Sequence, residues 1–243
     1  MSVYFSGQGT VYGSVRSNLG APTTYLALGN CPSLILHMAE GIVTNAANGG
    51  QALANVVRGT DLPTFSMVLE DVNPNNLALM LYGQNNTVTG GSISGEVISN
   101  IAPNTSQPVA NINLSSFSLT NGATTYVNGF DYTIDLPTGM ITFPSSSTCA
   151  ASCTANYNYG NHSKVGAATQ APPFMWLRFQ GMNTGNTNEP VVVDIYKTKL
   201  YPVQDIPLIG DSIVQFPITG RIFQDTSRTY TDAEGQFMRI RKV

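Results

Sequence analysis

The chain has 243 residues, of which 42% are hydrophobic and only 10% are charged. Its formal net charge is −3, which excludes the strongly basic surface that tight binding to nucleic acid requires. Because Asn, Thr, Ser and Gly take most polar positions, the composition fits either a surface largely covered by further copies of the chain or an ordinary loop-rich β protein.

The first sixty residues predict short strands and one long loop. The N-terminus has neither the basic nor the apolar region of a secretory signal, and no stretch has the length of a membrane span. Alternating patterns predict strands at residues 10–15, 23–28 and 33–38. Residues 40–59 are rich in Asn and Gly and predict a long loop, which is either functional or a tolerated insertion.

Residues 62–70 predict a strand with two unlike faces. Alternate side chains point to opposite faces of a strand, so its apolar residues form one continuous stripe. The opposite face is mostly polar. Its polar residues are Thr64, Ser66 and Glu70.

A short helix is predicted directly after this strand. Asn73 is a favourable N-cap, and Pro74 suits a first helical position because no amide donor is needed there. Gly83 is expected in the left-handed position that ends the helix. A helix of about nine residues is not stable alone in water, so it must dock on a sheet. The side chains expected to make this contact are Leu77, Met80 and Leu81.

The rest of the chain predicts a succession of antiparallel strands. Short strands alternate with turns such as Asn128-Gly129, and longer strands follow at residues 174–180, 191–200 and 213–222. A final strand is predicted at residues 237–243. The sequence thus predicts an all-β, antiparallel sandwich or barrel with one short helix. We expect a single domain over residues 1–243, with a long loop at about 40–60 and an insertion at about 84–111.

No pattern in the chain is typical of catalysis or of metal binding. Cys149 and Cys153 lack a second ligand pair at the spacing of a zinc site, and a disulfide between them is not expected in a reducing cytosol. Glu70 and Asp71 are neighbours in the chain and point apart, and no nucleophile motif is present. We therefore expect no enzymatic activity, no metal and no cofactor.

The one basic cluster lies on the predicted C-terminal strand and contains Arg239, Arg241 and Lys242. Charges of this kind commonly protect an exposed sheet edge. The alternative is a contact between subunits, in which Arg239 and Arg241 pair with an acidic residue such as Asp205 or Asp225.

Six motifs occur in the order found in tail tube proteins of long-tailed bacteriophages. The segment NLALMLYG at residues 76–83 resembles the family signature NLALxLYG, and YLALGN at residues 25–30 resembles its YLGNVP segment. The other resemblances are YVNGFDY at 126–132 with TGMI at 138–141, RFQGMN at 178–183, VVVDIY at 191–196, and IPLI at 206–209 with FMRIR at 237–241. The resemblance extends over nearly the whole chain.

This resemblance implies a structural virion protein with a tail tube fold, flanked by a helix, whose sheets join between subunits into a ring, typically of six. Stacked rings form the tail tube, through which double-stranded DNA passes into the host without tight binding. The implied partners are further copies of the chain, the tail tip or baseplate and the tail terminator, without a membrane. The implied location is the virion tail, after assembly in the host cytoplasm.

Two other functions remain open at this point. One is the tube of a contractile tail or injection system, which shares the fold. The other is a secreted, carbohydrate-binding β-sandwich with Trp176, Tyr157 and Tyr159 as a stacking platform, although the missing secretory signal argues against it.

In a tube of this kind, the expected site residues fall into groups. An acidic or neutral channel wall would not hold phosphates, so we expect Thr64, Ser66 and Glu70 to face the lumen. Arg239 and Arg241 are expected at subunit contacts. The loop at residues 40–59 is expected to reach the next ring, through Glu40, Asn45, Asn48, Gln51 and Arg58.

Overall fold

The structure is a computed structural model that describes residues 6–16, 21–22, 24–38, 63–185, 188–203, 205–211, 213–228 and 235–242. The chain divides into two compact units, one made of residues 1–84 and 165–243 and the other of residues 85–164. The prediction of one domain with an insertion at about 84–111 differs from this organisation, because the inserted segment continues to residue 164 and has a hydrophobic core of its own. Strand and turn patterns look alike whichever core they face, so the sequence did not reveal the boundary.

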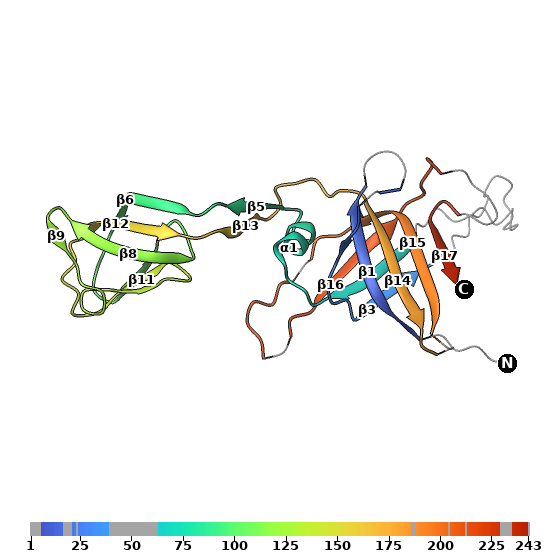
Figure 1. Ribbon diagram of the computed structural model, residues 1–243, viewed down its shortest axis with the longest axis horizontal. Helices are drawn as coiled ribbons and strands as arrows, with labels where there is room; N and C mark the ends of the chain where they lie inside the picture. The colour runs from blue at the N-terminus through green and yellow to red at the C-terminus, as the bar shows by residue number, and fades with distance from the viewer. Residues whose placement is uncertain are drawn as a thin grey trace, which may run out of the picture. The chain divides into compact units, whose positions relative to one another are not determined.

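The first unit is built on one antiparallel sheet, shown in Figure 1. Its main strand order is β2 (Leu26–Ala27), β1 (Gly7–Val15), β14 (Met175–Asn183), β15 (Glu189–Leu200), β16 (Phe216–Ile222), β4 (Thr64–Leu69) and β3 (Ser33–His37).

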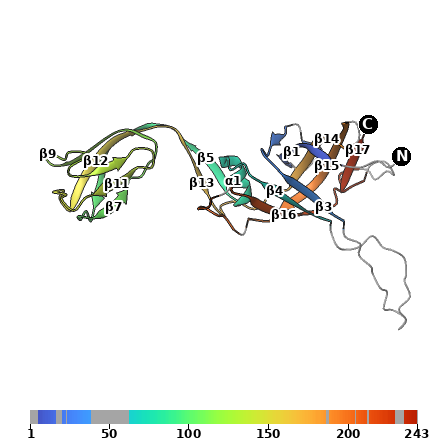
Figure 2. The ribbon, with the colours of Figure 1, turned by 90° about the horizontal axis from the view of Figure 1, so that it is seen from below.

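Strand β15 has two different partners along its far edge. Its residues 191–195 pair with β17 (Met238–Lys242), whereas residues 198–200 pair with β16. The sheet therefore parts at β15. Its two arms, β1–β14–β15–β17 and β16–β4–β3, contribute to one hydrophobic core and cross one another in Figures 1 and 2.

Alternation along β4 supplies part of this core, as the sequence predicted. Phe65, Met67 and Leu69 are buried, and the residues between them are half-buried. Strand β16 shows the same period of two, because alternate side chains of a strand point to the same face.

The helix α1 (Pro74–Met80) begins as predicted. The Asn73 side-chain oxygen accepts hydrogen bonds from the backbone N–H groups of Asn75 at 3.1 Å and Asn76 at 2.9 Å. Pro74 occupies the first turn. These contacts confirm both start signals, since they satisfy amide donors that have no partner inside the helix.

The end of α1 differs by one residue from the prediction. Tyr82, with φ 50°, takes the left-handed position that we expected for Gly83. The N–H of Gly83 donates to the carbonyl of Ala78 at 2.7 Å, which closes the helix end. Glycine is needed at position 83 for another reason, because a Cβ atom there would lie 2.1 Å from the carbonyl oxygen of Gly166.

The second unit packs two small antiparallel sheets around a separate core. One sheet has the order β6 (Gly91–Ser99), β12 (Ser152–Tyr159), β8 (Leu114–Asn121) and β9 (Thr124–Thr125), and the other β10 (Thr133–Asp135), β11 (Met140–Phe143) and β7 (Thr105–Pro108). The chain enters through β5 (Gln84–Val88) and leaves through β13 (His162–Gly166), which pair with each other.

A buried carboxylate stabilises the predicted turn at Asn128-Gly129. Asp131 accepts hydrogen bonds from the Thr148 hydroxyl at 2.6 Å and from the Val127 N–H at 2.8 Å. These bonds hold the pKa of Asp131 below its usual value. The sheets of both units are antiparallel, and the described residues contain one helix. The predicted all-β, antiparallel fold with one short helix is therefore confirmed.

Candidate functional site

The polar face of β4 ends at a carboxylate held by neutral partners. The Asn30 side-chain amide donates to one oxygen of Glu70 at 2.5 Å, and the Gln215 amide donates to the other at 2.8 Å. Thr64 and Ser66 are half-buried on β4, which ends one residue before Glu70. Because both amides are uncharged, these contacts orient Glu70 without cancelling its charge. That this face lines a channel stays a prediction.

The predicted docking residues of α1 differ in their surroundings. Met80 is fully buried, and Leu77 is half-buried and packs against the core of the first unit, as expected. Leu79 packs there too, whereas Leu81 lies outside this cluster at the C-cap position. The N–H of Leu81 donates to the carbonyl of Leu77 at 2.9 Å, so this residue caps the helix, but its side chain is not among those that pack against the core cluster.

A polar side chain that the sequence did not single out also docks α1. Asn76 is buried, and its side-chain amide donates to the carbonyl of Leu28 at 2.9 Å and to that of Asp71 at 3.0 Å. These two bonds connect the helix to the segments that precede β3 and α1. The five residues expected to reach the next ring lie outside the described residues: Glu40, Asn45, Asn48, Gln51 and Arg58.

The two C-terminal arginines meet at a buried carboxylate of the same chain. Arg241 approaches Asp194 at 2.9 Å and Arg239 approaches it at 3.3 Å, while Arg178 binds the other carboxylate oxygen at 3.0 Å. The strand register explains this meeting, because Asp194 lies opposite Arg178 on one neighbour and opposite Arg239 on the other. A further contact of Arg239 and Arg241 with another subunit stays a prediction.

This arginine cluster, formed by Arg178, Arg239 and Arg241 around Asp194, carries more positive than negative charge. The Asp194 side chain is 1% exposed, whereas the Arg241 side chain is 49% exposed. Tyr25 lies close enough to sense these charges: burial and the charge of Asp194 raise its pKa, and two of the arginines oppose the rise. The cluster therefore presents guanidinium groups to solvent over a buried anion.

Asp225, which the sequence offered as a partner for the C-terminal arginines, binds Arg16 instead. Their atoms lie 2.6 Å apart, and both side chains are buried. The Ser227 hydroxyl donates to the same carboxylate oxygen at 2.6 Å. Burial raises the pKa of Asp225, but these hydrogen bonds and the charge of Arg16 outweigh it and leave the pKa below its usual value.

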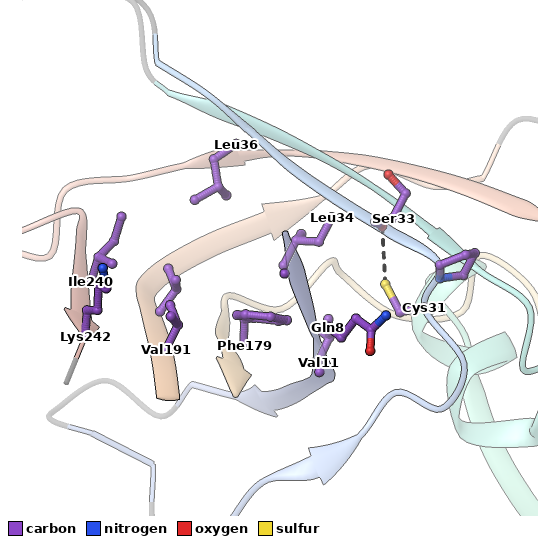
Figure 3. A pocket seen from close by; sticks show the side chains of 14 residues that line it. Gln8, Val11, Cys31, Ser33, Leu34, Leu36, Phe179, Val191, Ile240 and Lys242 are labelled. Carbon is purple, nitrogen blue, oxygen red and sulfur yellow. Dashed lines mark hydrogen bonds between the residues drawn. The ribbon is translucent and has the colours of Figure 1, made fainter. Parts of the chain in front are cut away.

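An apolar hollow of about 870 Å³ opens between the two arms of the first unit, as Figure 3 shows. Lys242 is the charged residue in its lining and is paired with Glu189 at 2.7 Å. Cys31 lines the hollow as a free thiol whose pKa is raised by burial. The apolar walls come from every strand of the first arm and from β3: Val11, Leu34, Leu36, Phe179, Val191, Val193 and Ile240.

Strand edges border this hollow. In the part of the chain that the structure describes, β3 is the last strand on its side of the sheet. At the other border, β2 pairs with β1 only at Tyr12 and Gly13, so residues 7–10 of β1 have β14 as their described strand partner. Open edges of this kind pair readily with another strand unless something covers them.

Among the described residues, no group of three or more His, Cys, Asp or Glu side chains is arranged to hold a metal ion. Cys149 and Cys153 are free thiols. No described helix has both the length and the apolar character needed to cross a membrane.

The stacking platform, which the sequence left open as an alternative, does not form on Trp176 and Tyr157. Trp176 is buried in the first unit, and Tyr157 is buried in the second unit. Trp176 packs against Tyr196 at a ring-centroid distance of 4.9 Å, on the face of β14 opposite Met175 and Leu177, and Tyr157 packs in the core of the second unit. Both rings are therefore buried side chains rather than surface stacking residues.

Sequence reasoning missed Asp194 and the apolar hollow. The first had a signal, since a lone acidic residue interrupts the apolar run VVVDIY at residues 191–196. Such a residue in a buried strand needs a cationic partner. The hollow had no such signal, because it arises from the parting of the sheet at β15.

Comparison with known protein families gives a match over nearly the whole chain. Residues 4–241 match a family model described as "Protein of unknown function UCP028589". None of the curated proteins matches the chain.

Proposed function

The chain belongs to this family, and we propose that it is a structural protein that assembles with copies of itself into stacked rings, forming the tail tube of a long-tailed bacteriophage. The observation that carries the proposal is the apolar hollow between the arms of the first unit, with the edges of β1 and β3 beside it. In this function the chain is a conduit for DNA and not an enzyme.

Open strand edges favour association with other copies. An edge exposes unpaired N–H and C=O groups, and pairing with a strand of a neighbour satisfies them. When strands of several subunits close into one large barrel, the edges disappear. Contacts between unlike surfaces then repeat from copy to copy, which generates a ring if the rotation closes and a filament if it does not.

The surface chemistry of the second unit also suits close packing against other proteins. Across residues 85–164, the charged side chains are Glu96, Asp131, Asp135 and Lys164. Of these, Asp131 is buried in a turn. Hydroxyl and amide side chains cost less to remove from water than unpaired charges, so a surface of this type associates at a smaller desolvation cost.

The polar face of β4 is our candidate for the channel wall. The Glu70 carboxylate accepts hydrogen bonds from two neutral amides, and a carboxylate on a channel wall repels a passing phosphate backbone. Such repulsion is short-ranged, screened over about 10 Å at 0.1 M salt. A wall with this property guides DNA without holding it.

Electron microscopy of the purified protein in negative stain tests the proposal. We expect rings or tubes with a central channel, formed without any other protein. A chain that stays monomeric at every concentration would contradict the proposal. A contractile-tail tube would look similar in this assay, and a sheath protein that coats the tubes would identify that variant of the function.

A further inference from the structure

The loop between β15 and β16 exposes three aliphatic side chains to solvent. Ile209 is 98% exposed, Leu208 87% and Ile213 73%, the highest values among the large hydrophobic residues that the structure describes. Single exposed aliphatic residues are ordinary, but three within six positions form a patch that needs a partner. We call these exposed residues, 208–211 together with 213, the tip.

Both ends of the tip are fixed to the first unit. On one side Ile206 packs against the hydrophobic core, and on the other Val214 does so. The N–H of Val203 donates to the carbonyl of Met80 at 3.2 Å, and Gln215 holds Glu70. The tip is therefore presented by an anchored loop, which lowers the entropy lost when it binds a partner.

The apolar hollow matches the tip in chemistry. Its walls are aliphatic and aromatic, and its one charged lining residue is Lys242. Asp205 precedes the exposed aliphatic side chains, and Asp211 lies among them, between Ile209 and Ile213; both are exposed. When the tip enters the hollow, its aliphatic side chains contact the apolar walls. The carboxylates of the tip then lie near Lys242 at the rim of the hollow and near Arg241, which is on the same strand, β17.

We propose that the tip of one copy occupies the apolar hollow of a second copy. In Figure 1 the tip is part of the orange-red loop that projects away from the sheet, and its side chains are too exposed to fill the hollow of their own chain. A tip and a hollow on different parts of one surface give a head-to-tail contact that repeats along an assembly. The inference rests on the proposed function, since it names a contact that would join the subunits.

Chemical crosslinking tests the contact directly. Besides Cys31, the chain has two other free cysteines, so the test is made in a background with Cys149→Ser and Cys153→Ala. In this background native Cys31 lines the hollow, and Ile209→Cys places a second thiol in the tip. With a short bismaleimide, we expect covalent dimers and longer ladders from Ile209→Cys. In the same background, the matched control Ile209→Cys with Cys31→Ser, and the chain without Ile209→Cys, should give none. Crosslinks confined to single chains, or ladders that persist without Cys31, would overturn the inference.

A second measurement does not depend on tube formation. A labelled peptide with the sequence of residues 203–215 should bind the full chain in fluorescence anisotropy, and the peptide with Ile209→Asp should bind at least about tenfold more weakly. The peptide with Ile209→Val should bind like the original, because it keeps an aliphatic side chain. Equal binding of all three peptides, or none, would contradict the inference.

The two proposals can fail separately. Peptide binding at the hollow by a chain that forms no rings would refute the tube and support the contact. Rings or tubes that form unchanged from Ile209→Asp protein, without Cys31-dependent crosslinks, would support the tube and refute the contact.

Discussion

Replacement of Asp194 by Asn is expected to destabilise the first unit strongly. The carboxylate is 1% exposed and receives three arginines at 2.9 to 3.3 Å, so its removal leaves guanidinium groups without their counter-ion. Breaking a fully buried ion pair costs about 3–5 kcal/mol. The arginine side chains here are 23% to 49% exposed, and water can partly solvate them. We therefore expect a loss of about 3 kcal/mol, near the lower end of that range.

The assay is denaturant unfolding followed by tryptophan fluorescence. Trp176 is the single tryptophan of the chain and is buried in the first unit, so its emission reports that unit. A loss of this size corresponds to a fall of roughly 6–12 °C in Tm for a protein of this length.

A matched control lies on the same strand. Glu189 pairs with Lys242 near the surface, so Glu189→Gln should cost less than about 1 kcal/mol. Equal losses of unfolding free energy in Asp194→Asn and Glu189→Gln would refute the reasoning about the arginine cluster. They would show that the burial of the carboxylate does not increase the cost of removing its charge.

Two further predictions concern single residues of the first unit. The lowered pKa of Asp225 means that the unfolded chain binds a proton more readily, so this group stabilises the fold above the ordinary Asp pKa and loses that effect as pH falls through the lowered value. The stability difference between the unsubstituted chain and Asp225→Asn should accordingly shrink between about pH 6 and pH 3 in urea titrations, and a difference that stays constant would contradict the role of Arg16. Gly83→Ala should destabilise the unit by more than the roughly 1 kcal/mol typical of point substitutions, because its Cβ would meet the Gly166 carbonyl. An unchanged urea midpoint would show that the backbone at Gly83 and Gly166 moves apart freely.

Local signals in the sequence predicted local structure well. The alternation in β4, the N-cap at Asn73 and the turn around Asn128 all appear where expected, because each depends on neighbours within a few residues. The end of α1 was placed one residue too late. Glycine is required at position 83 because the backbone of Gly166 lies close to it. The helix signal in the sequence carries no information about that distant segment.

The candidate site was only partly within reach of the sequence. Arg239 and Arg241 were recognised as a pair, but their partner Asp194 lies 45 positions away from Arg239 in the chain. Strand register brings them together, and register is set by the pairing of whole strands. The sequence also did not predict the tip. Its aliphatic residues are of the type found in cores, and only the fold shows that they are exposed.

By itself, the sequence determined the fold class, the period of the strands, the capping of the helix and a surface poor in charge, because these depend on residue type and short-range spacing. Only the tertiary structure decided that residues 85–164 form a separate unit and that the sheet parts at β15 to leave an apolar hollow. It also decided that Asp194 gathers three arginines. Those features depend on which distant strands pair and in what register, and the free energy that selects the pairing is spread over the whole core rather than held in any one segment.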